Sequence, residues 1–285
     1  MRPAPSQPPA SGQRQHFELP RPHERRAPLL MGILNVTPDS FSDGGQFSAP
    51  ELALAHARRM IEEGADLIDI GAESTRPYAG AEPVSAEVEL ARLRPVLPEV
   101  VKLGIPVSID SMKAQVAEWA VANGAALIND VWGLQHDSGM ADIVARSSVP
   151  VVVMHNRLAV DPAIDVVADM LAFFARSLEI AAQAGIPKAR IALDPGIGFG
   201  KTPEQSMTAL AHLAALKVFG CAILVGASRK RFIDTVTPSP PRQRLGGSIA
   251  AHLLAVQNGA HIIRTHDVAE TRQALRVAAA IEDKR

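Results

Sequence analysis

The chain has 285 residues, of which 47% are hydrophobic and 21% are charged, and its formal net charge is −1. The balance of 29 basic and 30 acidic residues excludes the broad basic surface of a nucleic-acid-binding or membrane-surface protein. No apolar run reaches the roughly 20 residues of a membrane-spanning helix. Cys221 is the only cysteine, so we expect no intrachain disulfide and a reducing, cytoplasmic location.

The first 28 residues differ in composition from the rest of the chain. They contain seven prolines and five arginines but no sustained apolar period. Such a segment buries too little apolar surface to offset the entropy cost of ordering it. We therefore expect a disordered extension over 1–28, dispensable for stability and activity, and a single domain over 29–285. A signal peptide is not expected, because no apolar stretch follows the basic residues.

From residue 29 onward, short apolar runs alternate with helical patterns. The runs lack polar alternation, which is typical of parallel strands that are covered on both faces. The stretch 85–103 contains Pro95 and Pro98, so we expect its helix to be kinked or split. The predicted strands cover 29–36, 66–71, 106–109, 126–128, 149–154, 190–193, 222–225 and 261–263.

Eight predicted strands, each followed by helix, indicate the α/β class and a single-domain (β/α)8 TIM barrel. A doubly wound open sheet is the alternative. The active site of such a barrel lies at the carboxyl ends of its strands, and here every predicted strand ends in polar residues. Helix capping does not require this combination of Asp, Asn, Lys, Arg and His. Residues at these strand ends include Asn35, Asp69, Asp110, Asn129, His155, Asp194, Lys230 and Arg264.

Charge is unevenly distributed over this predicted rim. Carboxylates and an amide follow the middle strands at Asp110, Asn129 and Asp194, whereas the cations Lys230 and Arg264 follow the last two strands. The loops after the seventh and eighth strands of a barrel commonly bind phosphate, and carboxylates accept hydrogen bonds from ring N–H groups. The pattern predicts a site for a nitrogen-rich heterocycle that carries phosphate.

The glycine-rich stretch 196–202 resembles a phosphate-binding P-loop, but Pro195 stands where that motif has its first glycine. Lys201 stands where a dinucleotide-binding fingerprint has its third glycine. We interpret the stretch as a glycine-rich barrel loop, with an anion contact as the alternative. The nine histidines show no paired ligand spacing, so a zinc site made by the protein alone is not expected.

Two long segments resemble the signatures of the dihydropteroate synthase family, which is a family of pterin-binding barrels. They are MGILNVTPDSFSDGG at 31–45 and DPGIGFGK at 194–201. The resemblance extends over 29–282 and implies a transferase of folate biosynthesis. Members of the family join 6-hydroxymethyl-7,8-dihydropterin diphosphate to p-aminobenzoate and release diphosphate. Shorter segments match in family order at 73–77, 108–110, 128–130, 228–230 and 264–267.

The resemblance also implies a role for each matching residue, a Mg²⁺ ion and a homodimer. Asn35 would bind the Mg²⁺ on the diphosphate. An SN1-like displacement is implied, in which the bond to diphosphate breaks first, with Asp110, Arg264 and His266 as the catalytic residues. The implied substrate-binding residues are Asp110, Asn129, Asp194 and Lys230 for the pterin, Arg264 and His266 for the diphosphate, Thr75 and Arg76 for the diphosphate and p-aminobenzoate, and Ser228 for the p-aminobenzoate pocket.

The chain departs from the family pattern at two places. Tyr78 and Ala79 are inserted after Pro77, and the strand-five histidine is followed by Asn156 and Arg157. Two other functions compete with the synthase. A methyltetrahydrofolate methyltransferase would share the pterin site but would need no diphosphate site. A non-catalytic paralogue would bind pterin diphosphate without turnover.

Overall fold

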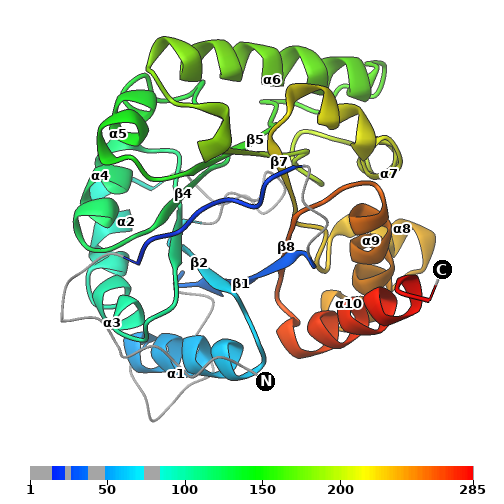
Figure 1. Cartoon of the computed structure of the whole chain (residues 1–285), viewed down its shortest axis with the longest axis horizontal. Coiled ribbons are helices and arrows are strands. Elements are labelled where there is room, and N and C mark those ends of the chain that lie inside the picture. Colours follow the sequence, from blue (N-terminus) through cyan, green and yellow to red (C-terminus); the bar gives the residue numbers. More distant parts are fainter. Residues whose placement is uncertain (1–14, 23–26, 38–48, 74–83, 285) are drawn as a thin grey trace.

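The computed structural model describes residues 15–22, 27–37, 49–73 and 84–284. Within these residues, eight parallel strands pair in chain order and close into a barrel, which the helices surround (Figure 1). The predicted (β/α)8 TIM barrel is confirmed, and the open doubly wound sheet is excluded. The strands are β1 (Leu29–Asn35), β2 (Leu67–Gly71), β3 (Val107–Asp110), β4 (Leu127–Asp130), β5 (Val151–Met154), β6 (Ile191–Asp194), β7 (Ala222–Val225) and β8 (Ile262–Thr265).

The helices cover the outside of the barrel, and the stretch with two prolines is split as predicted. Helix α3 begins with Pro98 in its first turn, where the missing N–H of proline costs no helical hydrogen bond. Among the described residues, no helix is long and apolar enough to cross a membrane. The α-helices are α1 (Ala49–Glu62), α2 (Ala86–Leu93), α3 (Leu97–Val101), α4 (Ala114–Ala122), α5 (Met140–Ser147), α6 (Val166–Gln183), α7 (Pro203–Ala211), α8 (Arg231–Val236), α9 (Leu245–Gln257) and α10 (Val268–Glu282).

Side-chain caps fix the starts of the two helices that follow β5 and β6. At α6, the carboxylate of Asp165 accepts hydrogen bonds from the backbone N–H groups of Val167 and Ala168. At α7, Thr202 and Gln205 form a reciprocal capping box. Each cap satisfies N–H groups that have no partner within the helix. The first turns of α6 and α7 are thereby held close to the carboxyl ends of the strands.

The inside of the barrel is apolar at one end and polar at the other. A cluster of inward-facing residues fills the amino-terminal half, and it includes Met31, Leu67, Leu127, Ala192 and Ile262. Because side chains alternate between the two faces of a strand, residues two positions further along point inward as well. Those positions hold Ile33, Asp69, Asn129, Asp194 and Arg264. The alternation therefore brings most of these polar groups together at the carboxyl-terminal mouth.

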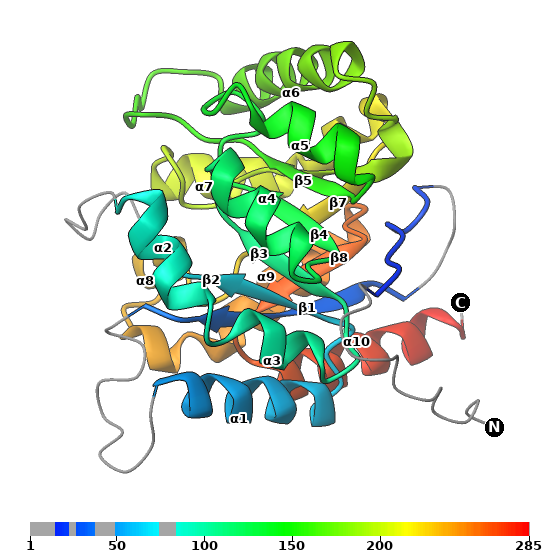
Figure 2. The same ribbon diagram turned by 90° about the vertical axis from the view of Figure 1, so that its left-hand side faces the viewer.

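Residues 15–22 cross the amino-terminal end of the barrel (Figures 1 and 2, dark blue). The side chain of Leu19 is only 8% exposed and belongs to the interior cluster, with Phe17 packed beside it. Nε2 of His261 lies 3.4 Å from the carbonyl oxygen of Pro22. For residues 15–22 these contacts differ from the expectation of a disordered 1–28 segment, because Phe17 and Leu19 pack on the apolar interior of the barrel. Residues 1–14 and 23–26 lie outside the described residues.

Candidate active site

A pocket opens at the carboxyl ends of the strands, where the sequence predicts the site. Five of the predicted residues share it, so strands β3, β4, β6 and β8 and the loop after β7 all contribute to one binding surface. Its lining residues are Asp110, Asn129, Val131, Met154, Asp194, Ile197, Phe199, Gly226, Lys230 and Arg264.

Three buried acceptor atoms at this mouth have no hydrogen-bond partner in the described part of the chain. They are Oδ1 of Asp69, Oδ1 of Asp110 and Oδ1 of Asn129. A buried polar atom without a partner costs about 1–3 kcal/mol, so such atoms are expected to find a partner in the functional state. Because all three accept hydrogen bonds, the missing partner is a donor, such as the N–H edge of a heterocycle.

Asp69 is fully buried, and it is a site residue to which the sequence motifs assign no role. Its Oδ2 accepts hydrogen bonds from Nδ2 of Asn129 at 3.1 Å and from Nε of Arg264 at 2.7 Å. Asp69 therefore fixes the orientation of two lining residues at once. Its inward position on β2, two residues before the end of the strand, was the available indication in the sequence.

Arg264 does not stand apart from the carboxylates, as the separation of charges along the sequence suggested. Besides Asp69, it contacts Asp110, with Nη2 donating to Oδ2 at 3.0 Å. Burial raises the pKa of the Asp110 carboxyl, and the negative charge of Asp69 adds to this shift, whereas Arg264 opposes it. The guanidinium thus forms ion pairs with two buried carboxyl groups.

Asp194 and Lys230 form the opposite wall of the pocket. Oδ1 of Asp194 accepts a hydrogen bond from the backbone N–H of Gly196 at 2.8 Å, and its side chain is buried. Burial raises the pKa of Asp194, while the N–H of Gly196 and the charge of Lys230 oppose the shift. Nζ of Lys230 lies 4.3 Å from the ring centroid of Phe199, which is within the range of a cation–π contact. Sequence reasoning assigned no role to Phe199.

The loops after β7 and β8 are joined by polar contacts. Ser228 Oγ lies 3.0 Å from Nδ1 of His266 and accepts a hydrogen bond from the backbone N–H of His266 at 3.2 Å. Between Ser228 and Lys230, Arg229 has a φ of +57°, a left-handed conformation that is unfavourable for a side chain of this size. Its guanidinium forms an ion pair with Asp267, and its N–H donates to Oγ of Ser248 at 2.8 Å. Arg229 and Asp267 therefore position the predicted residues Ser228 and His266, a role that sequence reasoning missed.

Asn35 ends β1 at the same mouth. A Cβ added to Gly71 would lie 3.6 Å from Oδ2 of Asp110 and 3.7 Å from Oδ1 of Asn35, so both oxygens border the space beside this glycine. Within the described residues, no group of three or more His, Cys, Asp or Glu side chains is arranged to hold a metal ion. In the described part of the chain, Asn35 therefore belongs to no metal site made by such side chains.

Comparison with known proteins assigns the chain to a family. Residues 31–266 match the family model described as pterin binding enzyme. The chain belongs to this family. The dihydropteroate synthase of Bacillus subtilis (strain 168) is 46% identical over 257 residues, which is 90% of this chain and 89% of that protein.

Two solved structures of dihydropteroate synthase from Xanthomonas albilineans have the same fold. One contains 4-aminobenzoic acid; it is 48% identical with a TM-score of 0.86, and the match covers 90% of this chain and 93% of that chain. The other is in complex with 7,8-dihydropteroate; it is 46% identical with a TM-score of 0.82, over 90% and 94% of the two chains. The resemblance to the dihydropteroate synthases, and with it the assignment to the transferases, is confirmed.

Two residues that the family resemblance places in the site, Thr75 and Arg76, lie outside the described residues, as do the inserted Tyr78 and Ala79. The positions that flank this segment are described. Glu73 forms an ion pair with Nζ of Lys113, and Oε1 of Glu73 accepts a hydrogen bond from the backbone N–H of Val84 at 3.1 Å. Residues 73 and 84 are therefore held together beside β3, a link that the sequence did not reveal.

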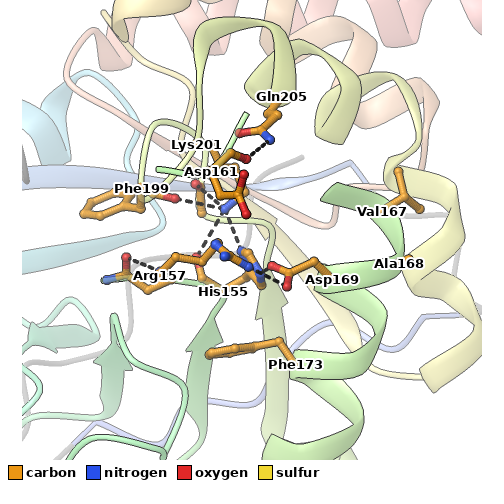
Figure 3. A network of polar contacts seen from close by, with 12 residues as sticks. His155, Arg157, Asp161, Val167, Ala168, Asp169, Phe173, Phe199, Lys201 and Gln205 are labelled. Atoms are coloured by element: carbon orange, nitrogen blue, oxygen red, sulfur yellow. Dashed lines mark hydrogen bonds and ion pairs between the residues drawn. The ribbon is translucent and has the colours of Figure 1, made fainter. Parts of the chain in front are cut away.

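In this member of the pterin-binding family, the glycine-rich stretch 196–202 is a barrel loop, as interpreted from the sequence. The side chain of Lys201 is 2% exposed and is directed inward, with Nζ donating to backbone carbonyl groups (Figure 3). The alternative, an anion held by Lys201 as in a P-loop, does not fit this inward placement. Thr202 caps helix α7.

Proposed function

We propose that the protein joins 6-hydroxymethyl-7,8-dihydropterin diphosphate to p-aminobenzoate, giving 7,8-dihydropteroate and diphosphate in folate biosynthesis. The observation that carries this proposal is the pair of unpartnered buried acceptors, Oδ1 of Asp110 and Oδ1 of Asn129, within one pocket. The 2-amino-pyrimidinone edge of a pterin presents adjacent N–H donors, which a carboxylate and an amide oxygen accept. Family membership and the ligands of the Xanthomonas structures support the same assignment.

At the pterin end, Asp110, Asn129 and Asp194 accept hydrogen bonds from the ring. Lys230 is held against Phe199 at the pocket wall, where it donates to ring acceptors. Charge-assisted hydrogen bonds of this kind are roughly twice as strong as neutral ones. The pterin is thereby fixed with its methylene carbon directed towards the outer rim.

At the diphosphate end, Arg264 and His266 bind the leaving group, and Ser228 lies beside them at the p-aminobenzoate pocket. Arg264 is already oriented by Asp69 and Asp110, so it is preorganised next to the place where negative charge develops. His266 is oriented by Ser228. Thr75 and Arg76, by their family positions, approach the diphosphate and p-aminobenzoate.

A Mg²⁺ ion fits this site as a companion of the diphosphate. Mg²⁺ in phosphate-transfer sites is commonly held by one or two protein oxygens together with substrate phosphates and water. Oδ1 of Asn35, which borders the same space beside Gly71 as the carboxylate of Asp110, supplies such an oxygen. When bound, the ion would neutralise charge on the leaving diphosphate.

The arrangement favours an SN1-like displacement. The C–O bond breaks with its electron pair leaving on the diphosphate, where Arg264 and His266 stabilise the charge. The positive methylene carbon is conjugated with the dihydropterin ring, and the ionised carboxylate of Asp110 stabilises that charge. The amine nitrogen of p-aminobenzoate then forms the new C–N bond and releases its proton, so the catalytic work of Asp110, Arg264 and His266 is electrostatic.

A cytoplasmic homodimer is part of the proposal. The family expectation of a homodimer is supported by exposed apolar side chains on the adjacent helices α9 and α10, namely Leu254, Val277 and Ile281. Scattered apolar residues are common on protein surfaces, so the molar mass in solution decides this point. The free cysteine Cys221, which is buried, is consistent with a reducing compartment.

An assay of diphosphate release tests the proposed function. With pterin diphosphate and p-aminobenzoate both present, we expect diphosphate and 7,8-dihydropteroate in equal amounts. Binding of pterin diphosphate without release would identify a non-catalytic paralogue. Equal affinity for the pterin with and without its diphosphate would favour a methyltransferase and would contradict the proposal.

A further inference from the structure

Lys201 is buried between the ends of β5 and β6, although it carries an ammonium group. Its Nζ lies 2.6 Å from Nδ1 of His155, 3.0 Å from the carbonyl oxygen of Gly196 and 3.1 Å from that of Phe199 (Figure 3). An ammonium group has three N–H donors, and these three acceptors match them. Burial lowers the pKa of Lys201, and the negative charges of Asp194 and Asp169 oppose that shift and favour the ammonium form.

The ammonium group determines the tautomer of His155. Because Lys201 donates to Nδ1, the hydrogen of the neutral ring is on Nε2, which donates to Oδ2 of Asp169 at 2.9 Å. Burial, together with the charge of Lys201, lowers the pKa of His155, so the neutral ring is favoured. Nη1 of Arg157 binds the other oxygen of Asp169 at 2.6 Å. A continuous chain of polar contacts thus links α6 to the loop after β6.

Two glycines allow this loop to lie directly on residues 155–157. Gly196 has a φ of +64°, and a Cβ there would be 1.9 Å from the carbonyl oxygen of His155. Gly200 has a φ of +55°, and a Cβ there would be 2.5 Å from Cβ of Arg157. No L-residue fits at either position, because both the conformation and the space are restricted. The close approach brings Nζ of Lys201 within reach of His155.

The two carbonyl groups that Lys201 holds belong to residues on either side of the pocket-facing turn. The N–H of Gly196 orients the carboxylate of Asp194, and the ring of Phe199 contacts Lys230. Between them, Ile197 lines the pocket. The contacts of Lys201 therefore affect the positions of Asp194 and Lys230, which form one wall of the pterin site, although Lys201 is not among the lining residues.

We propose that Lys201 is a positioning residue for the pterin site, which fixes the 195–200 loop against β5 through its contact with His155, whose ring is bound in turn by Asp169. The proposal rests on the proposed function, because it takes the 195–200 loop to be one wall of a pterin pocket. It gives a role to the residues that depart from the family pattern, since Arg157 completes the pairing of Asp169. His155 and Asp169 are positioning residues in the same sense.

Calorimetry with 6-hydroxymethylpterin tests this role in three variants. Lys201→Met removes the ammonium group, and Asp169→Asn removes the negative charge that His155 and Arg157 share and leaves only one acceptor oxygen for the two of them. Asp165→Asn is the matched control, because Asp165 lies in the same turn of α6 but only caps the helix. We expect the pterin Kd to rise at least tenfold in Lys201→Met and at least threefold in Asp169→Asn. We expect less than a twofold change in Asp165→Asn.

Two further measurements separate positioning from general stability. The KM for p-aminobenzoate should change less than twofold in the same variants, because the loop contacts the pterin end. Nitrogen NMR of the His155 ring should show the Nε2–H tautomer in the wild-type protein, and the Nδ1 resonance should shift in Lys201→Met, where the hydrogen bond from Nζ is lost. Thermal melting identifies variants that fail to fold.

The outcomes are distinguishable. An unchanged pterin Kd in folded Lys201→Met overturns the positioning role. If Lys201→Met does not fold, Asp169→Asn decides, and equal effects of Asp169→Asn and Asp165→Asn overturn it. If the wild-type protein itself does not bind the pterin, the proposed function fails, and the positioning role fails with it.

Discussion

Nε of Arg264 donates to Oδ2 of Asp69 at 2.7 Å, which joins β8 to β2 across the mouth of the barrel. The side chain of Asp69 is fully buried and that of Arg264 is 17% exposed. A buried ion pair adds little net stability compared with apolar residues, but the loss of one partner leaves an uncompensated charge. The pair therefore makes the stability of the barrel mouth depend on a residue of the proposed diphosphate site.

Arg264→Ala should lower the free energy of unfolding by about 3 kcal/mol, because it leaves Asp69 and Asp110 buried without a cation. Adding Asp69→Asn should recover part of this loss, since it removes one of the two buried negative charges. Urea unfolding of the two single variants and the double variant measures the coupling. Additive effects of the two substitutions would show that Arg264 and Asp69 do not interact energetically.

Asp194→Asn should weaken pterin binding by about 1.5–3 kcal/mol, which is the usual contribution of a hydrogen bond to a charged group. The asparagine oxygen can still accept the N–H of Gly196, so the loop should keep its position. Asp130→Asn serves as a control. Asp130 is also a buried strand-end carboxylate, but it binds the N–H groups of Trp132 and Leu134 and does not line the pocket. Calorimetry should show a higher Kd for the pterin in Asp194→Asn and an unchanged Kd in Asp130→Asn.

Asp110 should make the folded protein less stable as the pH rises. Burial, reinforced by Asp69 and opposed by Arg264, raises the pKa of its carboxyl from 3.8 to about 7. Between these two values the folded state binds more protons than the unfolded chain, so the free energy of unfolding from this group falls with increasing pH. In Asp110→Asn, the free energy of unfolding should therefore fall less between pH 3.8 and about pH 7 than in the wild-type protein. Urea unfolding at the two ends of this pH range measures the difference. An unchanged pH dependence in Asp110→Asn would contradict the raised pKa.

Leu19→Ala should lower the free energy of unfolding by about 2 kcal/mol, because Leu19 covers the apolar interior at the amino-terminal end. A chain that starts at Ala27 should lose at least as much, which replaces the expectation from composition that residues 1–28 are dispensable. Leu158→Ala is the control, since Leu158 is 92% exposed and should change stability by less than about 0.5 kcal/mol. Equal melting temperatures of all three variants and the wild type would show that the segment contributes nothing.

The sequence predicted those features that depend on local spacing. Asp110, Asn129 and Asp194 end apolar runs directly, and in a parallel barrel the ends of all the runs meet at one rim. The barrel itself follows from the same rhythm of strands and helices. The ends of these runs therefore suffice to predict that the three side chains share one mouth, and all three line the same pocket.

Contacts between strands that are not neighbours in the barrel could not be predicted from local spacing. Strand β8 is separated from β2 by β1, so the pairing of Arg264 with Asp69 depends on the width of the barrel mouth rather than on sequence spacing. The roles of Phe199 and Lys201 depend on the left-handed turns at the neighbouring glycines, which direct one side chain to the pocket and the other inward. At the opposite end of the barrel, the contact made by Leu19 could not be predicted from the average composition of residues 1–28, because it depends on a single apolar side chain.

The loop after β6 has a consequence for any attempt to redesign ligand preference. Positions 196 and 200 admit no side chain, because a Cβ at either would collide with residues 155–157. Random libraries that include these two codons would consist mainly of misfolded members, whatever ligand is used for selection. Ile197 and Phe199 lie between them and line the pocket. A small library restricted to these two positions should therefore explore new ring shapes while the backbone that presents them stays unchanged.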